Sequence, residues 1–279
     1  MKKWNELLNN ILEIENVNHL KGFIKTERLS KKVLPMPEMM FNAFNLCPIE
    51  NIKMIIIGNE PLESKYKPNG LSFSSGNDIV SPEFESILMM LKTGLYSHMN
   101  NEQFNLHFRY GNLERWAKNG ALMLNERMTT IQDSKNAHIN IGWEYFTEHI
   151  LNYISTNLNN IAFVFLNDNS ERYINIPDKS KHFVCSLKTS NNPMRDALNY
   201  LVSIQSKADF LTIDLKAFVD VKNLIDKVEK ELADKLFQDI GFVGLDDKYK
   251  NKPFREYIDE FMKKDYQFNF INVFDFKLK

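Results

Sequence analysis

The sequence predicts an α/β protein: a three-layer α/β/α sandwich with a central four-stranded parallel sheet, followed by a C-terminal appendage. Four short apolar runs are continuous rather than alternating, which is typical of parallel strands buried on both faces. They span residues 52–57, 121–124, 161–166 and 183–185. Stretches with helical periodicity separate these runs, and an alternation of strands with helices favours this architecture.

Four amphipathic helices are expected, because apolar residues recur at every third or fourth position in four stretches. These residues are Trp4, Leu7, Leu8, Ile11 and Leu12; Phe84, Ile87, Leu88 and Leu91; Trp143, Phe146, Ile150 and Ile154; and Ala197, Tyr200 and Leu201. Each helix can cover the sheet with its apolar side, which gives the two outer layers of the sandwich.

The segments that follow the four strands are polar and turn-prone. They are residues 58–61, Asn125, residues 167–170 and residues 189–194. Ligands of open parallel sheets bind outside the carboxyl ends of the strands, so we expect these segments to converge on one cleft. Any one of them, taken alone, also fits a simple solvated connection.

Composition narrows the class of protein. The chain has 279 residues, of which 43% are hydrophobic, so it can bury a large core. Its formal net charge of −1 is untypical of a general nucleic-acid binder, although a local basic stripe is compatible with it. Cys47 and Cys185 lie among apolar residues and are expected to be buried and inert. With no signal peptide and no apolar run of membrane-spanning length, we expect a soluble, intracellular, cytoplasmic protein.

Residues 218–279 differ from the rest of the chain. An apolar stripe at helical spacing runs from Val221 to Ile240, and residues 266–276 contain five aromatic side chains. We therefore divide the chain into a domain over residues 1–217 and an appendage over residues 218–279. The appendage is expected to bind a protein partner or a second copy of the chain, or else to fold back on the domain.

Several motifs occur in a specific order. They are Gly-Leu-Ser-Phe-Ser at 70–74, Gly-Ala-Leu-Met-Leu-Asn at 120–125, His138, and Gly-Trp-Glu-Tyr-Phe-Thr at 142–147. In this order they resemble family 1 uracil-DNA glycosylases, and the resemblance covers roughly residues 4 to 217. It implies the same four-stranded sheet, a base flipped out of DNA, and neither a metal nor a cofactor.

The resemblance implies two catalytic positions, and both are altered. The family places water with an aspartate in Gly-Gln-Asp-Pro-Tyr-His, but this sequence reads Gly-Asn-Glu-Pro-Leu-Glu at 58–63, so that Glu60 has a longer arm. The family stabilises the leaving base with a histidine in His-Pro-Ser-Pro-Leu-Ser. Here Ser190 takes that position if one residue is inserted, and Thr189 is the alternative without a gap.

The implied base-binding residues are partly retained. Phe73 resembles the aromatic residue that stacks on the flipped base, and Asn125 resembles the amide that pairs with its Watson–Crick edge. Asn59 belongs to the same set. Leu62 replaces the tyrosine that lies beside the 5-position of the base, so a 5-substituted pyrimidine becomes a candidate ligand.

The implied DNA-binding residues lie after the last strand and before the second helix. Met194 takes the place of the leucine wedge that enters the minor groove, and Lys188 and Arg195 flank it as candidate phosphate contacts. Glu83 introduces a negative charge where a phosphate is expected to lie.

Three functions follow from these residues. The first is a catalytically impaired relative that binds DNA or a protein partner through the glycosylase scaffold, associated with the nucleoid if it binds DNA. The second is a divergent glycosylase that excises uracil or a 5-substituted pyrimidine by attack of water at the sugar. The third is a structural or assembly factor that no longer binds nucleic acid.

Overall fold

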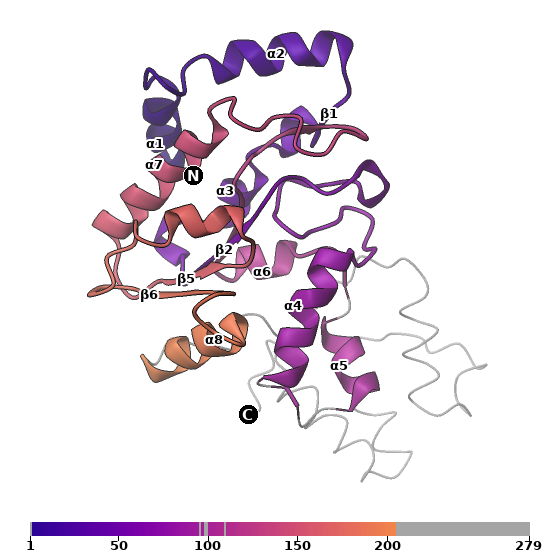
Figure 1. The fold of residues 1–279 in the computed structure, drawn as a ribbon, viewed down its shortest axis with the longest axis vertical. Coiled ribbons are helices and arrows are strands. Elements are labelled where there is room, and N and C mark those ends of the chain that lie inside the picture. Colours follow the sequence, from indigo (N-terminus) through magenta and orange to yellow (C-terminus); the bar gives the residue numbers. More distant parts are fainter. Residues whose placement is uncertain (1, 95, 98–99, 109, 205–279) are drawn as a thin grey trace, which may run out of the picture. The chain divides into compact units, whose positions relative to one another are not determined.

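The computed structural model describes residues 2–94, 96–97, 100–108 and 110–204, and it confirms the predicted α/β/α architecture (Figure 1). Four parallel strands form one sheet in the order β3-β2-β5-β6. Their bounds are β2 Met54–Gly58, β3 Ala121–Asn125, β5 Ala162–Phe165 and β6 Phe183–Ser186. Each observed strand overlaps its predicted run. The appendage, residues 218–279, and its boundary lie outside the described residues and stay predictions.

Helices lie on both faces of the sheet (Figure 1). The α-helices are α1 Lys2–Leu12, α2 Leu20–Ser30, α3 Asn42–Leu46, α4 Pro82–Thr93, α5 Asn101–Phe108, α6 Glu114–Lys118, α7 Trp143–Asn157 and α8 Pro193–Ser203. The short 3₁₀ helices are η1 Pro37–Met39, η2 Ile49–Asn51, η3 Ser64–Tyr66 and η4 Asn169–Tyr173. α8 packs on β5 and β6 with α4 beside it, and α1 packs on α7 at the opposite face.

The four expected helices correspond to α1, α4, α7 and α8. The sequence reasoning did not predict the other helices, nor a two-stranded antiparallel sheet formed by β1, Val33–Leu34, and β4, Thr130–Ile131. This small sheet holds residues 130–131 close to the carboxyl ends of the main strands, where the candidate site lies.

Burial follows the position of each strand in the sheet. Every residue of the central strand β2 is buried, as the sequence predicts. The edge strand β6 differs, because Phe183 and Val184 are only half buried. Both cysteines are buried, as predicted, and burial raises the pKa of each thiol to about 12, which disfavours the reactive thiolate. No helix in the described part of the chain is long and apolar enough to cross a membrane.

Close polar contacts hold the buried His138. Trp143 Nε1 donates to Thr129 Oγ1 at 2.7 Å, and the same oxygen lies 2.7 Å from His138 Nδ1. Burial lowers the pKa of His138 below its ordinary value of 6.5, although Glu27 opposes this. Burial therefore favours the neutral form of His138 in the folded protein.

We expect the protein to lose stability as the pH falls below 6.5, because the unfolded His138 takes up a proton there more readily than the folded one, whose pKa is lower. The largest slope from one such group is about 1.4 kcal/mol per pH unit. Thermal unfolding of wild type and His138→Gln between pH 5 and 7 measures this dependence of stability on pH. His149→Gln is the control, because His149 is a half-exposed histidine of α7. An equal slope in wild type and His138→Gln would contradict the assignment.

Candidate functional site

A cleft of about 620 Å³ opens at the carboxyl ends of β2, β3 and β5. Its lining includes Glu60 from the loop after β2, Asn125 from the end of β3, Asn167 after β5, and Phe73 and Leu62. The predicted convergence of strand-end loops is therefore confirmed for three of the four strands. The fourth strand contributes differently, through Leu187 instead of residues 189–194.

Asn125 is buried at the floor of the cleft. It is the last residue of β3, its side chain is 2% exposed, and its Oδ1 atom has no hydrogen-bond partner among the described residues. A buried amide oxygen without a hydrogen-bond partner destabilises the folded protein by about 1–3 kcal/mol. Such an unpaired group is typical of a site where a ligand is the partner. The position and chemistry of Asn125 fit those expected of a group that reads a polar edge.

Phe73 is held beside Asn125 by a strained turn. Its backbone φ is +62°, a conformation that is uncommon for a residue other than glycine. The preceding Ser72 anchors the turn, because its N–H donates to Met123 of β3 and its hydroxyl donates to Ile56 of β2. Such strain persists where surrounding contacts fix it, and here it places an aromatic ring in the cleft wall.

The Glu60 carboxylate faces the loop at 130–136. The N–H of Asn136 donates to both carboxylate oxygens at 3.1 Å, and the Thr130 hydroxyl donates to Oε2 at 3.2 Å. Glu60 thus lines the cleft as predicted, but hydrogen bonds from the protein already engage both of its oxygens.

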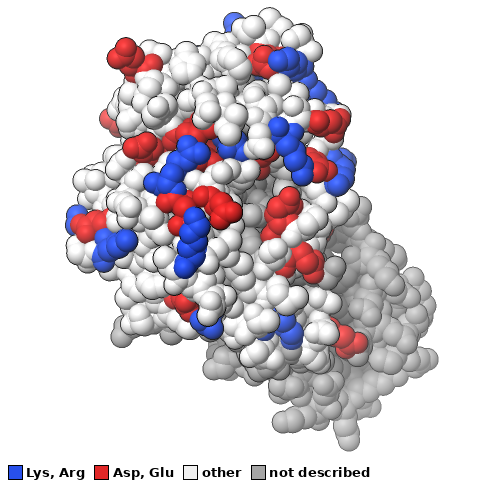
Figure 2. Space-filling view, in the orientation of Figure 1, with Lys and Arg blue, Asp and Glu red and all other residues white. Residues whose placement is uncertain are grey.

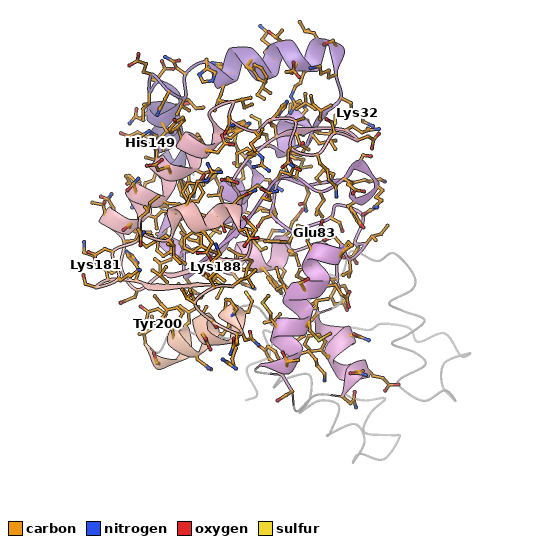
Figure 3. All side chains as sticks on the ribbon, viewed as in Figure 1. Lys32, Glu83, His149, Lys181, Lys188 and Tyr200 are labelled. Atoms are coloured by element: carbon orange, nitrogen blue, oxygen red, sulfur yellow. The ribbon has the colours of Figure 1, made fainter. Side chains whose placement is uncertain are left out.

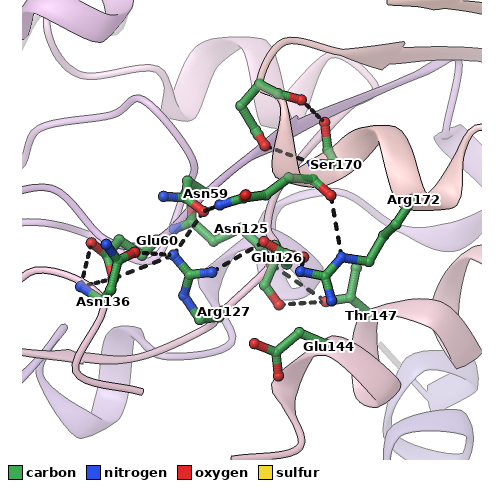
Figure 4. A network of polar contacts seen from close by, with 12 residues as sticks. Asn59, Glu60, Asn125, Glu126, Arg127, Asn136, Glu144, Thr147, Ser170 and Arg172 are labelled. Carbon is green, nitrogen blue, oxygen red and sulfur yellow. Dashed lines mark hydrogen bonds and ion pairs between the residues drawn. The ribbon is translucent and has the colours of Figure 1, made fainter. Parts of the chain in front are cut away.

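Beneath this carboxylate lies a buried charge network that the sequence reasoning missed (Figure 4). Glu126 and Arg127 follow β3 directly, and both side chains are 0% exposed. Arg127 Nη2 lies 3.7 Å from Glu60 Oε2, and Arg172 Nη2 lies 3.0 Å from Glu126 Oε1. Burial raises the pKa of the Glu126 carboxyl, and Arg172 and Arg127 offset part of that rise. Two charged residues directly after a buried strand were the available signal for this network.

The segment after β6 corrects the role expected of Ser190. The Ser190 hydroxyl donates to Asp196 at 2.5 Å and accepts from the N–H of Asn192, and Asn192 Oδ1 accepts from the N–H of Arg195. These contacts lie at the start of α8, and the hydrogen bond from Ser190, with a smaller contribution from Arg195, lowers the pKa of Asp196. Ser190 does not line the cleft, nor does Thr189. Leu187, which is 46% exposed, reaches the cleft from this segment instead.

Met194, the expected wedge, is enclosed in this structure, and its role in DNA binding stays a prediction. Met194 lies in the first turn of α8 and is 0% exposed, because α8 packs its apolar side on β5 and β6. A side chain in that position has no access to a DNA groove. Lys188 is exposed, as a phosphate contact requires (Figure 3), whereas Arg195 forms an ion pair with Asp196 at 2.9 Å.

Charges of both signs surround the cleft. Glu63, Glu83 and Asp133 line it together with Lys135, and Glu83 lies in the first turn of α4 (Figure 3). Figure 2 shows acidic and basic side chains interspersed on the visible face, without a continuous basic stripe. The electrostatic attraction between this face and a phosphate backbone is therefore weak.

Taken together, an aromatic ring, an unpaired buried amide and aliphatic walls suit a flat heterocycle with a polar edge. No protein-family model matches the chain. A uracil-DNA glycosylase of Borreliella burgdorferi is 34% identical over 193 residues, covering 68% of this chain and 82% of that protein. A uracil-DNA glycosylase of Psychromonas ingrahamii is 32% identical over 192 residues, covering 68% of this chain and 84% of that protein.

The fold of the described domain also resembles a solved structure. The crystal structure of mimivirus uracil-DNA glycosylase matches with a TM-score of 0.57 and 24% identity, covering 66% of this chain and 67% of that chain. This likeness agrees with the four-stranded parallel sheet found here. Because sequence similarity extends over 82% of the Borreliella protein, the chain belongs to the uracil-DNA glycosylase family.

Proposed function

We propose that this chain binds DNA, accepts a flipped pyrimidine in the cleft, and is strongly impaired in excising it. The observation that carries the proposal is the pairing of Asn125 with Phe73: a buried amide oxygen without a partner beside an aromatic ring. This pair provides hydrogen bonding and stacking, the two interactions by which flipped bases are held.

Two further observations support impaired excision. Glu60 accepts hydrogen bonds from Asn136 and Thr130, which hold its carboxylate, one methylene longer than that of an aspartate, toward the loop at 130–136. From the segment after β6 the apolar Leu187 lines the cleft, whereas Thr189 and Ser190 do not, so this segment supplies no side-chain hydrogen-bond donor to the cleft wall. Base recognition is thus retained while the hydrolytic groups are changed.

Replacing Asn125 by Leu is expected to weaken binding to single-stranded DNA carrying one uracil by about 10- to 100-fold, because one or two hydrogen bonds to the base are lost. Fluorescence anisotropy with uracil-containing and undamaged strands measures it. Asn157→Leu, an exposed residue of α7, is the control and should bind like wild type. A wild type without preference for the uracil strand would overturn the proposal.

A protein partner is the second candidate occupant of the scaffold, because Glu63, Glu83 and Asp133 line the cleft and repel phosphates. The salt dependence of binding separates the two candidates, since DNA binding weakens steeply with salt in proportion to the phosphates contacted. We further propose residues 218–279, which lie outside the described residues, as an interaction element.

A further inference from the structure

The buried Arg127 donates hydrogen bonds to two neutral amides in addition to its ion pair with Glu126. Its guanidinium is fully buried, and its Nη1 atom donates to Glu126 Oε2 at 3.2 Å. The two hydrogens of Nη2 go to two amide oxygens, Asn59 Oδ1 at 2.7 Å and Asn136 Oδ1 at 2.8 Å. A buried arginine needs hydrogen-bond partners. Two of these three hydrogen bonds go to neutral amides that line the cleft, those of Asn59 and Asn136.

These contacts fix the orientation of the Asn59 amide. Its Oδ1 atom also accepts from Asn169 Nδ2 at 3.0 Å, so both lone pairs of the oxygen are occupied. A rotated amide would place its NH₂ donors against the donors of Arg127 and Asn169, which is unfavourable. The Nδ2 atom therefore lies on the side away from Arg127 (Figure 4), and Asn59 is one of the residues that line the cleft.

We propose that Arg127 is a positioning residue, which makes Asn59 a fixed hydrogen-bond donor and so selects pyrimidines with a carbonyl oxygen at the position facing Asn59. Arg127 itself does not line the cleft. The inference rests on the proposed function, because it narrows the ligand class of the same cleft. Asn125, another amide of the cleft, makes no hydrogen bond with Arg127 in the described part of the chain and is expected to read its part of the base independently.

The test compares uracil with two free bases that each replace one carbonyl group by an amine, a change that also turns an adjacent ring N–H into an acceptor. Uracil carries carbonyl groups at C2 and C4, isocytosine replaces the first by an amine, and cytosine replaces the second. NMR titration gives the affinity ratio of uracil to each analogue for wild type and for Arg127→Met. In Arg127→Met the Asn59 amide can turn to accept from an amine. We expect one of the two ratios to fall about tenfold or more while the other stays unchanged.

If Arg127 had only a structural role, Arg127→Met would weaken the binding of all three bases equally and leave both affinity ratios unchanged. That result would overturn the inference. Arg172→Met is the matched control, because Arg172 also pairs with Glu126 but makes no contact with Asn59. Both ratios should stay at their wild-type values in it. If Arg127→Met does not fold, the double variant Glu126→Gln/Arg127→Met removes both buried charges and takes its place.

A second readout does not depend on ligand binding. The ¹⁵N order parameter of the Asn59 side-chain amide should be high in wild type and Arg172→Met and clearly lower in Arg127→Met. If wild type binds none of the bases, the proposed function fails, and a fall of this order parameter still supports the positioning by Arg127. An order parameter that is unchanged in Arg127→Met overturns the inference in either case.

Discussion

Uracil excision by this chain is expected to be about 10³-fold or more slower than by a family member with the intact aspartate and histidine motifs. A carboxylate displaced by about 1 Å costs roughly 10²-fold, and a missing donor to the developing negative charge costs about 10²- to 10³-fold. Single-turnover assays on single-stranded DNA carrying uracil, 5-hydroxymethyluracil or thymine measure the rates. The two 5-substituted bases are included because Leu62, which replaces the tyrosine expected beside the 5-position, lines the cleft. Turnover equal to that of an intact relative would refute the expectation.

Three variants locate the cause of the slow rate. Glu60→Gln should abolish any residual excision, because it removes the charge that a water at the sugar requires. Leu187→His should raise the rate and Ser190→His should not, because Leu187 lines the cleft and Ser190 caps α8. A gain from Ser190→His alone would show that the segment after β6 adopts another arrangement when DNA is bound.

Gly58→Ala is expected to weaken pyrimidine binding by about 10²-fold. A methyl group there would lie 2.8 Å from Ser72 Cβ, 2.9 Å from Asn125 Oδ1 and 3.3 Å from Phe73 Cε2. Ser72 is anchored to two strands and cannot yield, so Asn125 and Phe73 must move. Stacking alone is worth about 1–3 kcal/mol per base, and 1.4 kcal/mol is tenfold in affinity. Titration with uracil measures the loss.

Gly22→Ala provides the control for that experiment. Nothing lies within 4 Å of a methyl group at Gly22, which belongs to α2. It should leave uracil binding unchanged and raise the stability by up to about 1 kcal/mol, the difference in helix propensity. Equal binding by Gly58→Ala and Gly22→Ala would show that the base does not occupy the space beside Asn125 and Phe73.

The sequence was informative about the site wherever a residue follows a buried strand. Glu60 and Asn125 were predicted to share a cleft because parallel strands bring their carboxyl ends to one edge, and they do. The segment after β6 was less informative, because alignment to a motif assigns positions without orientations. Asn192 before Pro193 is a typical helix start, and this pattern was the local signal that these residues cap α8.

By itself the sequence determined the parallel sheet, the helices that cover it, and the edge where the cleft opens, because local apolar periodicity is enough to specify these elements. Only the tertiary structure decided which way the polar groups point. Asn59 is oriented by Arg127, 68 residues away, and by Asn169, 110 residues away, and Glu60 by Asn136, 76 residues away. Hydrogen bonds between such distant segments form only after the strands have paired, so no local pattern carries them.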